Sequence, residues 1–396
     1  MIIKPKFRGF ICTTSHPVGC AYSVQEQIDY VKKQKPVSGP KRVLVIGAST
    51  GYGLASRIVA AFGSGASTLG VFLEKPASGT NTATAGWYNT AAFEQAATEA
   101  GYYAKSINGD AFSDQVKIKT IEMVKEDLGQ VDLVVYSIAA PRRTHPVSGE
   151  VFSSVIKPIG SSFTSKTIDL NSSEIVDVTL EPANEQEILG TVAVMGGDDW
   201  ERWLGFLKDA GVLADGAVTV SYSYIGPKIT YPIYKEGTIG RAKDHLYAAS
   251  KKINKQFQDI NGRAFVAVNK ALVTQASAAI PVVPLYLMLL ARVMGQKGLD
   301  ENCVEQMYRL FASKLYGAEK LPDVEYLIRV DDYEMRKDVQ EEISELWETV
   351  CRGGMNITPD FESYRKEFFK LFGFGFSNVD YEQDVREDVP IPSIKS

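Results

Sequence analysis

Apolar runs alternate with helical apolar patterns through residues 41–140. The run from Val43 to Ile46 is continuously apolar and rich in β-branched side chains, which is typical of a strand buried on both faces. Between such runs, apolar residues recur three and four positions apart, as they do along an amphipathic helix. Further strands are predicted at residues 68–73, 103–107 and 131–137. The pattern predicts an α/β fold of Rossmann type, with a doubly wound parallel sheet and helices on both faces.

The rest of the chain adds segments to this sheet. Ser23 and Glu26 have the spacing of a capping box, which predicts a helix over residues 23–33. Strands resume at residues 217–224 and 265–269, with a helix between them at residues 240–257. We interpret the chain as one enlarged catalytic domain with an N-terminal extension at 1–40, a dinucleotide-binding half at 41–140, an insertion of hairpins on the substrate side at 141–216, a region for catalysis and the acyl pocket at 217–300, and a helical C-terminal part at 301–396.

The most apolar stretch runs from residue 276 to residue 294. Pro281 and Pro284 interrupt it, and its uncharged part is shorter than the roughly 20 residues that a membrane-spanning helix needs. We therefore do not expect an integral membrane protein. Two interpretations stay open for this stretch, a buried core helix and an apolar wall for a lipid-like substrate.

Composition and charge narrow the function classes. Of the 396 residues 45% are hydrophobic, enough for a sizeable core, and the net charge is −5. Because nucleic-acid-binding proteins normally carry a basic patch, no nucleic acid partner is expected. The amino terminus lacks a secretory pattern, and four cysteines are few for a disulfide framework in so long a chain. We expect a cytoplasmic protein that acts as a monomer.

The spacing of Cys12, His16 and Cys20 invites a zinc interpretation. These residues recur every four positions and would share one face of a helix. Pro17 and Gly19 argue against that helix, and no second His/Cys cluster supplies a fourth ligand. We therefore expect no metal.

A glycine-rich turn lies between the first predicted strand and the helix that follows it. Its pattern is G-x-x-x-G-x-G, in which missing Cβ atoms let the backbone approach a pyrophosphate at the helix N-terminus. This spacing is typical of the short-chain dehydrogenase/reductase superfamily. The predicted cofactor-binding residues of the turn are Gly47, Ala48, Ser49, Thr50, Gly51, Tyr52 and Gly53.

Further cofactor contacts are expected just after the predicted strands, at the carboxyl edge of the sheet. Glu74 follows the second strand, where its carboxylate would bind a ribose 2′-hydroxyl and repel a 2′-phosphate, so NADH is favoured over NADPH. Lys75 beside it could instead accept a phosphate. The other residues expected at this edge are Leu73, Asp110, Ala111, Ile138 and Ala139.

Reductases of this superfamily use a tyrosine to donate a proton and a lysine to stabilise the phenolate that remains. The pattern Tyr-x-x-x-Lys occurs three times, so the motif alone does not identify the site. An ordinary dehydrogenase would use the third pair, whose two residues share one helical face. The three pairs are Tyr224/Lys228, Tyr231/Lys235 and Tyr247/Lys251.

Several short stretches are more specific than these pairs. Over essentially its whole length the chain resembles the trans-2-enoyl-ACP/CoA reductase family, an enlarged branch of the short-chain dehydrogenase/reductase superfamily. The stretches that carry the resemblance are Gly-Ala-Ser-Thr-Gly-Tyr-Gly at 47–53, Gly-Trp-Tyr-Asn at 86–89, Gly-Asp-Ala-Phe-Ser at 109–113, Tyr-Ser-Ile-Ala at 136–139, Met-Gly-Gly-Asp-Asp-Trp at 195–200, Tyr-Ile-Gly-Pro at 224–227, Tyr234 and Lys243 around Gly-Thr-Ile-Gly, and Leu-Val-Thr at 272–274.

The resemblance implies NADH-dependent reduction of the trans-2 double bond of enoyl thioesters in fatty acid synthesis, with the substrate carried on acyl carrier protein or coenzyme A. Hydride would go to C3 and a proton to C2, with Tyr234 as the donor. Lys243 would bind the nicotinamide ribose, and Tyr224 would contact the thioester carbonyl. The implied carboxamide contacts are Leu272, Val273 and Thr274. The expected cofactor is NADH, with no flavin.

The spacing of Tyr234 and Lys243 makes a geometric demand. At about 100° per residue, nine steps would place them on opposite faces of a continuous helix. A break is therefore expected at residues 237–240, with Lys243 in the first turn of the next helix. The alternatives are an ordinary hydroxyl/ketone dehydrogenase that uses Tyr247 and Lys251, and a non-catalytic NADH-binding protein.

An acidic carrier protein would bind to an exposed basic patch. Arg142 and Arg143, in the predicted insertion, are the candidate residues for that patch.

Overall fold

The computed structural model describes residues 1–8, 11–169, 172–278, 280–318, 326–354, 356 and 358–394, and within them lies a seven-stranded parallel sheet. The strands, in their order across the sheet, are β13 (Leu327–Arg329), β12 (Arg263–Val268), β11 (Leu213–Ser223), β6 (Val131–Tyr136), β3 (Arg42–Ile46), β4 (Ser67–Phe72) and β5 (Ala104–Asn108). The predicted doubly wound α/β fold is confirmed.

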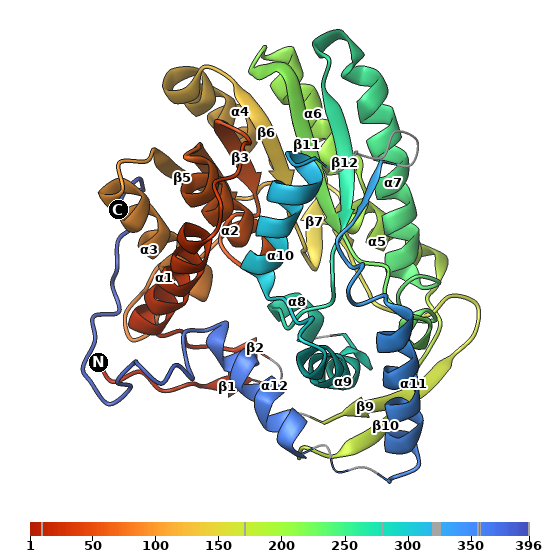
Figure 1. The fold of residues 1–396 in the computed structure, drawn as a ribbon. Coiled ribbons are helices and arrows are strands. Elements are labelled where there is room, and N and C mark those ends of the chain that lie inside the picture. Colours follow the sequence, from red (N-terminus) through yellow and green to blue (C-terminus); the bar gives the residue numbers. More distant parts are fainter. Residues whose placement is uncertain are drawn as a thin grey trace.

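Alternation along β3 explains the two helical layers of Figure 1. Val43 and Val45 pack into the core on one face of the sheet, while Leu44 and Ile46 pack into the core on the other face. The first face is covered by α1 (Pro17–Lys33), α2 (Gly51–Ile58), α3 (Ala85–Glu99) and α10 (Cys303–Arg309), and the second by α4 (Asp114–Met123), α6 (Asp198–Asp209) and α7 (Thr238–Gln256). A strand buried on both faces has to be apolar throughout, which is the pattern that the sequence showed.

Helix α1 begins six residues earlier than its predicted capping box. His16 is the N-cap, and its Nδ1 accepts a hydrogen bond from the N–H of Gly19 at 3.2 Å. Pro17 is tolerated because the first helical position needs no N–H partner. A Cβ on Gly19 would lie 1.7 Å from the carbonyl oxygen of Gly373, so close packing against the C-terminal segment requires that glycine. Pro17 and Gly19 therefore do not prevent a helix from starting here, as the sequence had suggested. The helix that would carry Cys12, His16 and Cys20 on one face nevertheless does not form, because Cys12 lies in β2 (Ile11–Cys12).

The insertion contains the expected hairpins. Strand β7 (Arg142–Thr144) pairs with β8 (Val151–Ser153), and β9 (Phe163–Ile168) pairs with β10 (Ile175–Leu180), both antiparallel. Residues 170 and 171 of the insertion lie outside the described residues. Helix α5 (Glu185–Met195) was not predicted, although Asn184 and Glu187 form a capping box at its start.

Most of the apolar stretch forms one buried helix, which lies beyond the carboxyl ends of the strands (Figure 1). The stretch contains α8 (Gln275–Ala278) and α9 (Val283–Gln296), and α9 packs against α11 (Lys337–Cys351) and α12 (Thr358–Lys370). Among the described residues, no helix is both long enough and apolar enough to cross a membrane. Helices are the main elements of the described C-terminal part, as predicted, but it also supplies β13, which was not predicted.

Short elements complete the described chain. They are the hairpin β1 (Phe7–Arg8) and β2 (Ile11–Cys12), π-helical ends at Val59–Gly63, Val124–Leu128 and Leu310–Leu315, and 3₁₀ turns at Lys228–Thr230 and Gln258–Ile260.

Candidate active site

The glycine turn at residues 47–53 uses its three glycines in two ways. A Cβ on Gly47 would lie 2.0 Å from the carbonyl oxygen of Ser137, and one on Gly53 would lie 1.9 Å from that of Gly47. These two positions let the turn pack against β6 and against itself. Gly51 has a positive φ of 53°, and no atom lies within 4 Å of a Cβ placed there. The start of α2 therefore faces open space, where its N–H groups can meet a phosphate.

The carboxylate of Glu74 lies at the edge of this turn. Its Oε1 accepts a hydrogen bond from the hydroxyl of Ser49 at 2.6 Å, and its backbone pairs with the side-chain amide of Asn108. A Cβ on Gly86 would lie 2.0 Å from the same Oε1, so only glycine leaves room for the carboxylate. The Gly86–Asn89 stretch thus shapes the site from the N-terminus of α3. Lys75 is exposed.

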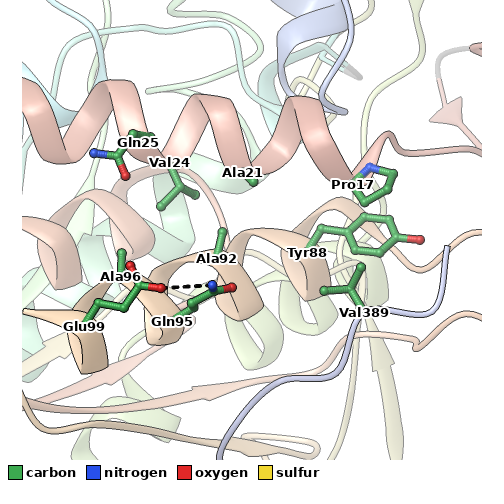
Figure 2. A pocket seen from close by; sticks show the side chains of 10 residues that line it. All are labelled: Pro17, Ala21, Val24, Gln25, Tyr88, Ala92, Gln95, Ala96, Glu99 and Val389. Carbon is green, nitrogen blue, oxygen red and sulfur yellow. Dashed lines mark hydrogen bonds between the residues drawn. The ribbon is translucent and has the colours of Figure 1, made fainter. Parts of the chain in front are cut away.

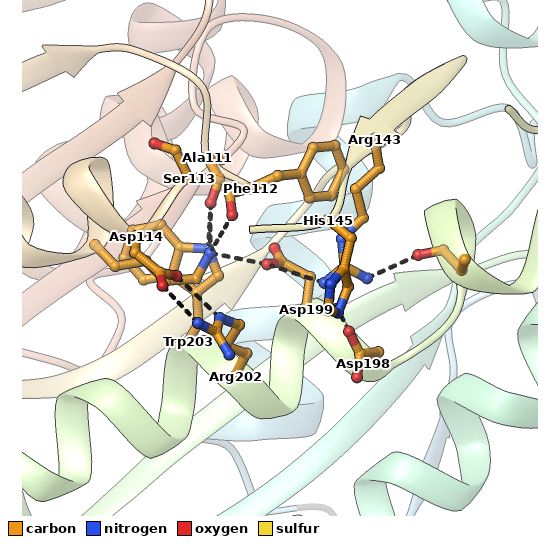
Figure 3. Close-up of polar contacts among 12 residues, drawn as sticks. Ala111, Phe112, Ser113, Asp114, Arg143, His145, Asp198, Asp199, Arg202 and Trp203 are labelled. Carbon is orange, nitrogen blue, oxygen red and sulfur yellow. Dashed lines mark hydrogen bonds and ion pairs between the residues drawn. The ribbon is translucent and has the colours of Figure 1, made fainter. Parts of the chain in front are cut away.

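The loop at residues 110–113 is held in place by hydrogen bonds from buried side chains (Figure 3). The carbonyl of Ala111 accepts hydrogen bonds from Lys117 Nζ at 2.8 Å and from Trp203 Nε1 at 3.0 Å. Lys117 also pairs with Asp199 at 2.8 Å, and both side chains are almost fully buried. Asp110 caps the loop by accepting a hydrogen bond from the N–H of Phe112 at 2.9 Å. We call this loop, with Lys117 and Asp199, the nucleotide end of the site.

Three further residues complete the polar cluster behind that loop. Arg143 pairs with Asp198 at 2.6 Å and approaches Asp199 to 3.9 Å, and Tyr136 donates a hydrogen bond to Asp199 at 3.0 Å. Burial raises the pKa of Asp199 and lowers the pKa of Lys117. In each case the opposite charge of the partner acts in the other direction but is outweighed. Arg143 is 2% exposed, so it does not form the basic surface patch that the sequence suggested.

Burial separates the lysines that follow the candidate tyrosines. The lysines of the three Tyr-x-x-x-Lys pairs are all exposed, namely Lys228, Lys235 and Lys251. Lys243 is instead partly buried, and its Nζ lies 3.4 Å from the carbonyl oxygen of Tyr222 at the end of β11. Burial lowers the pKa of Lys243 to about 8.

The expected break between Tyr234 and Lys243 is present. Gly237 is extended and caps α7, which begins at Thr238, so Tyr234 lies in the turn before the helix. Lys243 was predicted in the first turn of α7 but lies in its second turn. The two residues are therefore not carried on one continuous helix.

The phenol of Tyr234 lies in a cluster of aromatic rings. Its side chain is 9% exposed, and its ring is 5.0 Å from that of Tyr224 at an interplanar angle of 74°. Burial, with a smaller contribution from Tyr247, raises the pKa of Tyr234, so the phenol keeps its proton at neutral pH. Tyr247, the alternative candidate, shares a hydrogen bond with Ser223 at 2.9 Å.

A buried carboxylate that sequence reasoning missed lies behind Tyr224. Glu334 accepts hydrogen bonds from the phenols of Tyr224 and Tyr286 at 2.9 and 2.7 Å on Oε1, and from the N–H of Ala271 at 2.7 Å on Oε2. No motif surrounds Glu334, and its burial depends on contacts far apart in sequence. We call Tyr224, Tyr234, Lys243 and Glu334 the tyrosine end of the site.

Tyr52 joins the glycine turn to β11 and to the segment after β12. From the glycine turn its hydroxyl donates a hydrogen bond to the carbonyl of Lys270 at 2.6 Å, and its ring lies 5.9 Å from that of Tyr222. The adjacent loop of Leu272, Val273 and Thr274 is held by Ser277, which accepts from the N–H of Thr274 at 2.9 Å and donates to the carbonyl of Leu272 at 2.6 Å.

The remaining cofactor candidates line the same edge of the sheet more loosely. Leu73 is 69% exposed, Ala139 is exposed, and Ile138 is partly buried. All three follow strands that neighbour β3 in the sheet.

Two cavities lie away from these residues. One of about 210 Å³ lies between α1 and α3, with Tyr88 and Val389 at one end and the hydrogen-bonded pair Gln95 and Glu99 at the other (Figure 2). The other, of about 500 Å³, is lined by polar residues of α6 and by His145. Neither is lined by a candidate catalytic residue, so the site is defined by the geometry of its side chains.

Known proteins share this architecture. Residues 81–316 match a family model described as the trans-2-enoyl-CoA reductase catalytic region, and residues 2–79 match one described as the NAD(P)H binding domain of trans-2-enoyl-CoA reductase. A trans-2-enoyl-CoA reductase [NADH] of Ruminiclostridium cellulolyticum is 57% identical, with 100% of both chains covered. An enoyl-[acyl-carrier-protein] reductase [NADH] of Coxiella burnetii is 56% identical, covering 100% of this chain and 98% of the relative.

A solved structure has the same fold along its entire length. The trans-2-enoyl-CoA reductase of Clostridium acetobutulicum in complex with NADH superimposes with a TM-score of 0.95 at 43% identity, covering 100% of both chains.

The expectation that no flavin is involved is wrong, because residues 322–385 match a family model described as an enoyl reductase FAD binding domain. In the described part of this segment, however, the buried faces of α11 and α12 pack against α9 through Val339, Ile343 and Phe361. A Cβ on Gly373 would lie 2.5 Å from the carbonyl oxygen of His16. These faces of α11 and α12 are occupied by contacts within the protein.

The catalytic-region match covers more than half of the residues, and the relatives align with the chain from end to end. The chain belongs to the trans-2-enoyl-CoA reductase family.

Proposed function

We propose that the protein reduces the trans-2 double bond of enoyl thioesters with NADH, as an enoyl-ACP or enoyl-CoA reductase of fatty acid synthesis. The observation that carries the proposal is the inward position of Lys243, across a helix break from the buried phenol of Tyr234. The lysines of the competing Tyr-x-x-x-Lys pairs are exposed. The names of the relatives support the same activity.

NADH supplies the hydride that adds to C3 of the substrate, which leaves an enolate on the thioester. Tyr234 hydrogen-bonds the enolate oxygen and is the donor of the proton that C2 receives. Its raised pKa keeps that proton in place until negative charge develops on the substrate. Lys243 holds the nicotinamide ribose, and its ammonium lowers the cost of a phenolate at Tyr234.

The remaining site residues orient the two reactants. Tyr224 contacts the thioester carbonyl, and backbone groups of Leu272, Val273 and Thr274 hold the nicotinamide carboxamide. Residues 47–53, Leu73, Asp110, Ala111, Ile138 and Ala139 bind the rest of the dinucleotide. Glu74 presents its second carboxylate oxygen to the ribose, since Ser49 occupies the first.

In this reaction, each part of the chain has its own role. Residues 41–140 bind the dinucleotide, residues 141–216 border the substrate, and residues 217–300 supply the catalytic side chains and the acyl pocket. Because Arg143 is buried, an acidic carrier protein would have to be recognised by other residues than the Arg142–Arg143 pair.

The decisive experiment follows NADH absorbance with crotonyl-CoA, dodecenoyl-CoA and the matching acyl carrier protein thioesters. The wild type should oxidise NADH, and Tyr234→Phe should lower kcat by about 100- to 10,000-fold, the usual range for a lost general acid. Tyr247→Phe is the matched control and should retain most of the activity. The opposite ranking would identify an ordinary dehydrogenase site, and an inactive wild type would favour a non-catalytic NADH-binding protein.

A further inference from the structure

Glu334 occupies an unusual place for a carboxylate. Its side chain is 0% exposed, and it lies in the turn between β13 and α11. The groups that contact its carboxyl oxygens come from three other parts of the fold: Tyr224 after β11, Ala271 after β12, and Tyr286 on α9. Gln340 holds the turn itself by donating to the backbone carbonyl of Glu334 at 2.7 Å. So many ties from separate segments fix the carboxyl group in one orientation.

We propose that Glu334 is a positioning residue for Tyr224, and that its carboxyl group sets the direction in which the phenol of Tyr224 donates its proton. This inference rests on the proposed function, in which Tyr224 contacts the thioester carbonyl. The edge-to-face contact between Tyr224 and Tyr234 brings Glu334 within one side chain of the proposed proton donor.

The contacts of Glu334 are satisfied in either protonation state. As a carboxylate, Oε1 accepts from Tyr224 and Tyr286, and Oε2 accepts from Ala271. As a carboxylic acid protonated on Oε1, it donates to Tyr224 while still accepting from Tyr286. The phenolic proton of Tyr224 is then free to point at the thioester oxygen. Only O–H bonds and hydrogen bonds change between the two states.

Burial favours the second state. It raises the pKa of Glu334. The hydrogen bonds from Ala271, Tyr286 and Tyr224 and the more distant charge of Lys270 lower this pKa, but by less. The ammonium of Lys270 is itself paired with Asp300 at 2.8 Å. The strongest contacts to this carboxyl group are thus neutral donors, which allow the proton to be shared with Tyr224 more readily than a direct cation would.

A double-mutant cycle with Tyr224 tests the inference. Glu334→Leu should lower kcat/KM for crotonyl-CoA about tenfold or more when Tyr224 is present, and by less than about twofold in the Tyr224→Phe background, because the residue acts through that phenol. Glu334→Gln should retain at least about a third of the activity, since its amide can donate to Tyr224 as the acid does. Equal losses in both backgrounds, or a Gln variant as impaired as the Leu variant, would overturn the inference.

Two further variants protect the test. If Glu334→Leu does not fold, Glu334→Asp keeps the carboxyl group but withdraws it by one methylene, and it should show the same dependence on Tyr224. Glu94→Gln alters another fully buried glutamate, which contacts Arg57 and Ser393 near β5, at the opposite edge of the sheet from β13. It should leave kcat/KM within about twofold of the wild type. A wild type that does not reduce enoyl thioesters would refute the proposed function, whereas an active wild type without coupling would refute this inference alone.

Discussion

The two ends of the candidate site each bury a carboxylate, but the groups around it differ. At the nucleotide end, Asp199 lies 2.8 Å from the ammonium of Lys117 and 3.9 Å from the guanidinium of Arg143. At the tyrosine end, Glu334 is contacted by two phenols and one backbone N–H. The first carboxylate is neutralised by fixed charges, whereas the second is hydrogen-bonded by neutral donors.

The difference matches what the proposed function requires of each end. A loop that binds a nucleotide needs a fixed backbone, and the Lys117 ammonium that neutralises Asp199 also holds the carbonyls of Ala111 and Phe112. A group that takes part in proton transfer has to tolerate two protonation states, which neutral donors permit. Burial alone therefore does not define the role of a carboxylate. The charge of the groups that contact it defines that role.

The largest expected effect separates the two carboxylates by stability. Asp199→Leu leaves Lys117 and Arg143 buried without their shared anion, so the free energy of unfolding should fall by about 3–5 kcal/mol. Glu334→Leu strands neutral donors and should cost less, about 1–3 kcal/mol. Urea unfolding of both variants, followed by circular dichroism, measures the difference. Equal losses would show that the contrast between the two ends has no energetic basis.

The sequence predicted the sheet better than the parts that close the site. Strands such as β3 are apolar along their whole length, so local pattern identifies them. Strand β13 is only three residues long, Leu-Ile-Arg, and its position depends on pairing with β12 rather than on its own pattern. The start of α1 was missed because His16 is an uncommon cap and the fit of Gly19 depends on Gly373, far away in sequence.

The candidate site was predictable where a motif fixes the backbone, as in the glycine turn. The choice of Lys243 over three competing lysines came from the resemblance, because side-chain exposure around α7 cannot be read from spacing. Glu334 was out of reach for a different reason. Its contacts come from Tyr224, Ala271 and Tyr286, and only the folded chain brings these together.

The next effect tests the tyrosine end by pH. Burial lowers the pKa of Lys243 from 10.5 to about 8, so its ammonium loses its proton as pH rises through about 8. If the ammonium is required, kcat/KM for NADH should fall above that pH, approaching about tenfold per unit. Lys243→Arg should move the fall to higher pH, because a guanidinium stays charged. A wild-type profile that is flat to pH 10 would contradict this role.

Stability should respond to the same group in the opposite direction. Between pH 8 and 10.5 the unfolded chain binds more protons at Lys243 than the folded chain, so its contribution to the free energy of unfolding rises with pH. In this pH range kcat/KM should therefore fall while the contribution of Lys243 to the free energy of unfolding rises. Both changes should be smaller in Lys243→Met. Urea midpoints measured across the range provide the check.

A smaller effect tests the nucleotide side without touching charge. Gly86→Ala places a Cβ 2.0 Å from Glu74 Oε1 and 2.8 Å from the Cβ of Ser49, so the carboxylate has to move. KM for NADH should rise about tenfold, equivalent to about 1.4 kcal/mol of binding, with kcat nearly unchanged. The matched control is Gly205→Ala in α6, where no atom lies within 4 Å of the new Cβ. A loss confined to kcat would contradict a role for Gly86 in shaping the cofactor site.

The smallest effect concerns the choice between NADH and NADPH. Glu74→Ala removes the proposed hydrogen bond to the ribose, worth about 1 kcal/mol, so KM for NADH should rise about fivefold. It also removes the negative charge that would repel a 2′-phosphate, so kcat/KM for NADPH should increase. Lys75→Ala is the matched control, since Lys75 is adjacent and exposed. If Lys75→Ala instead lowers NADPH use while Glu74→Ala changes neither coenzyme, cofactor choice depends on the lysine, and the carboxylate serves only to hold Ser49.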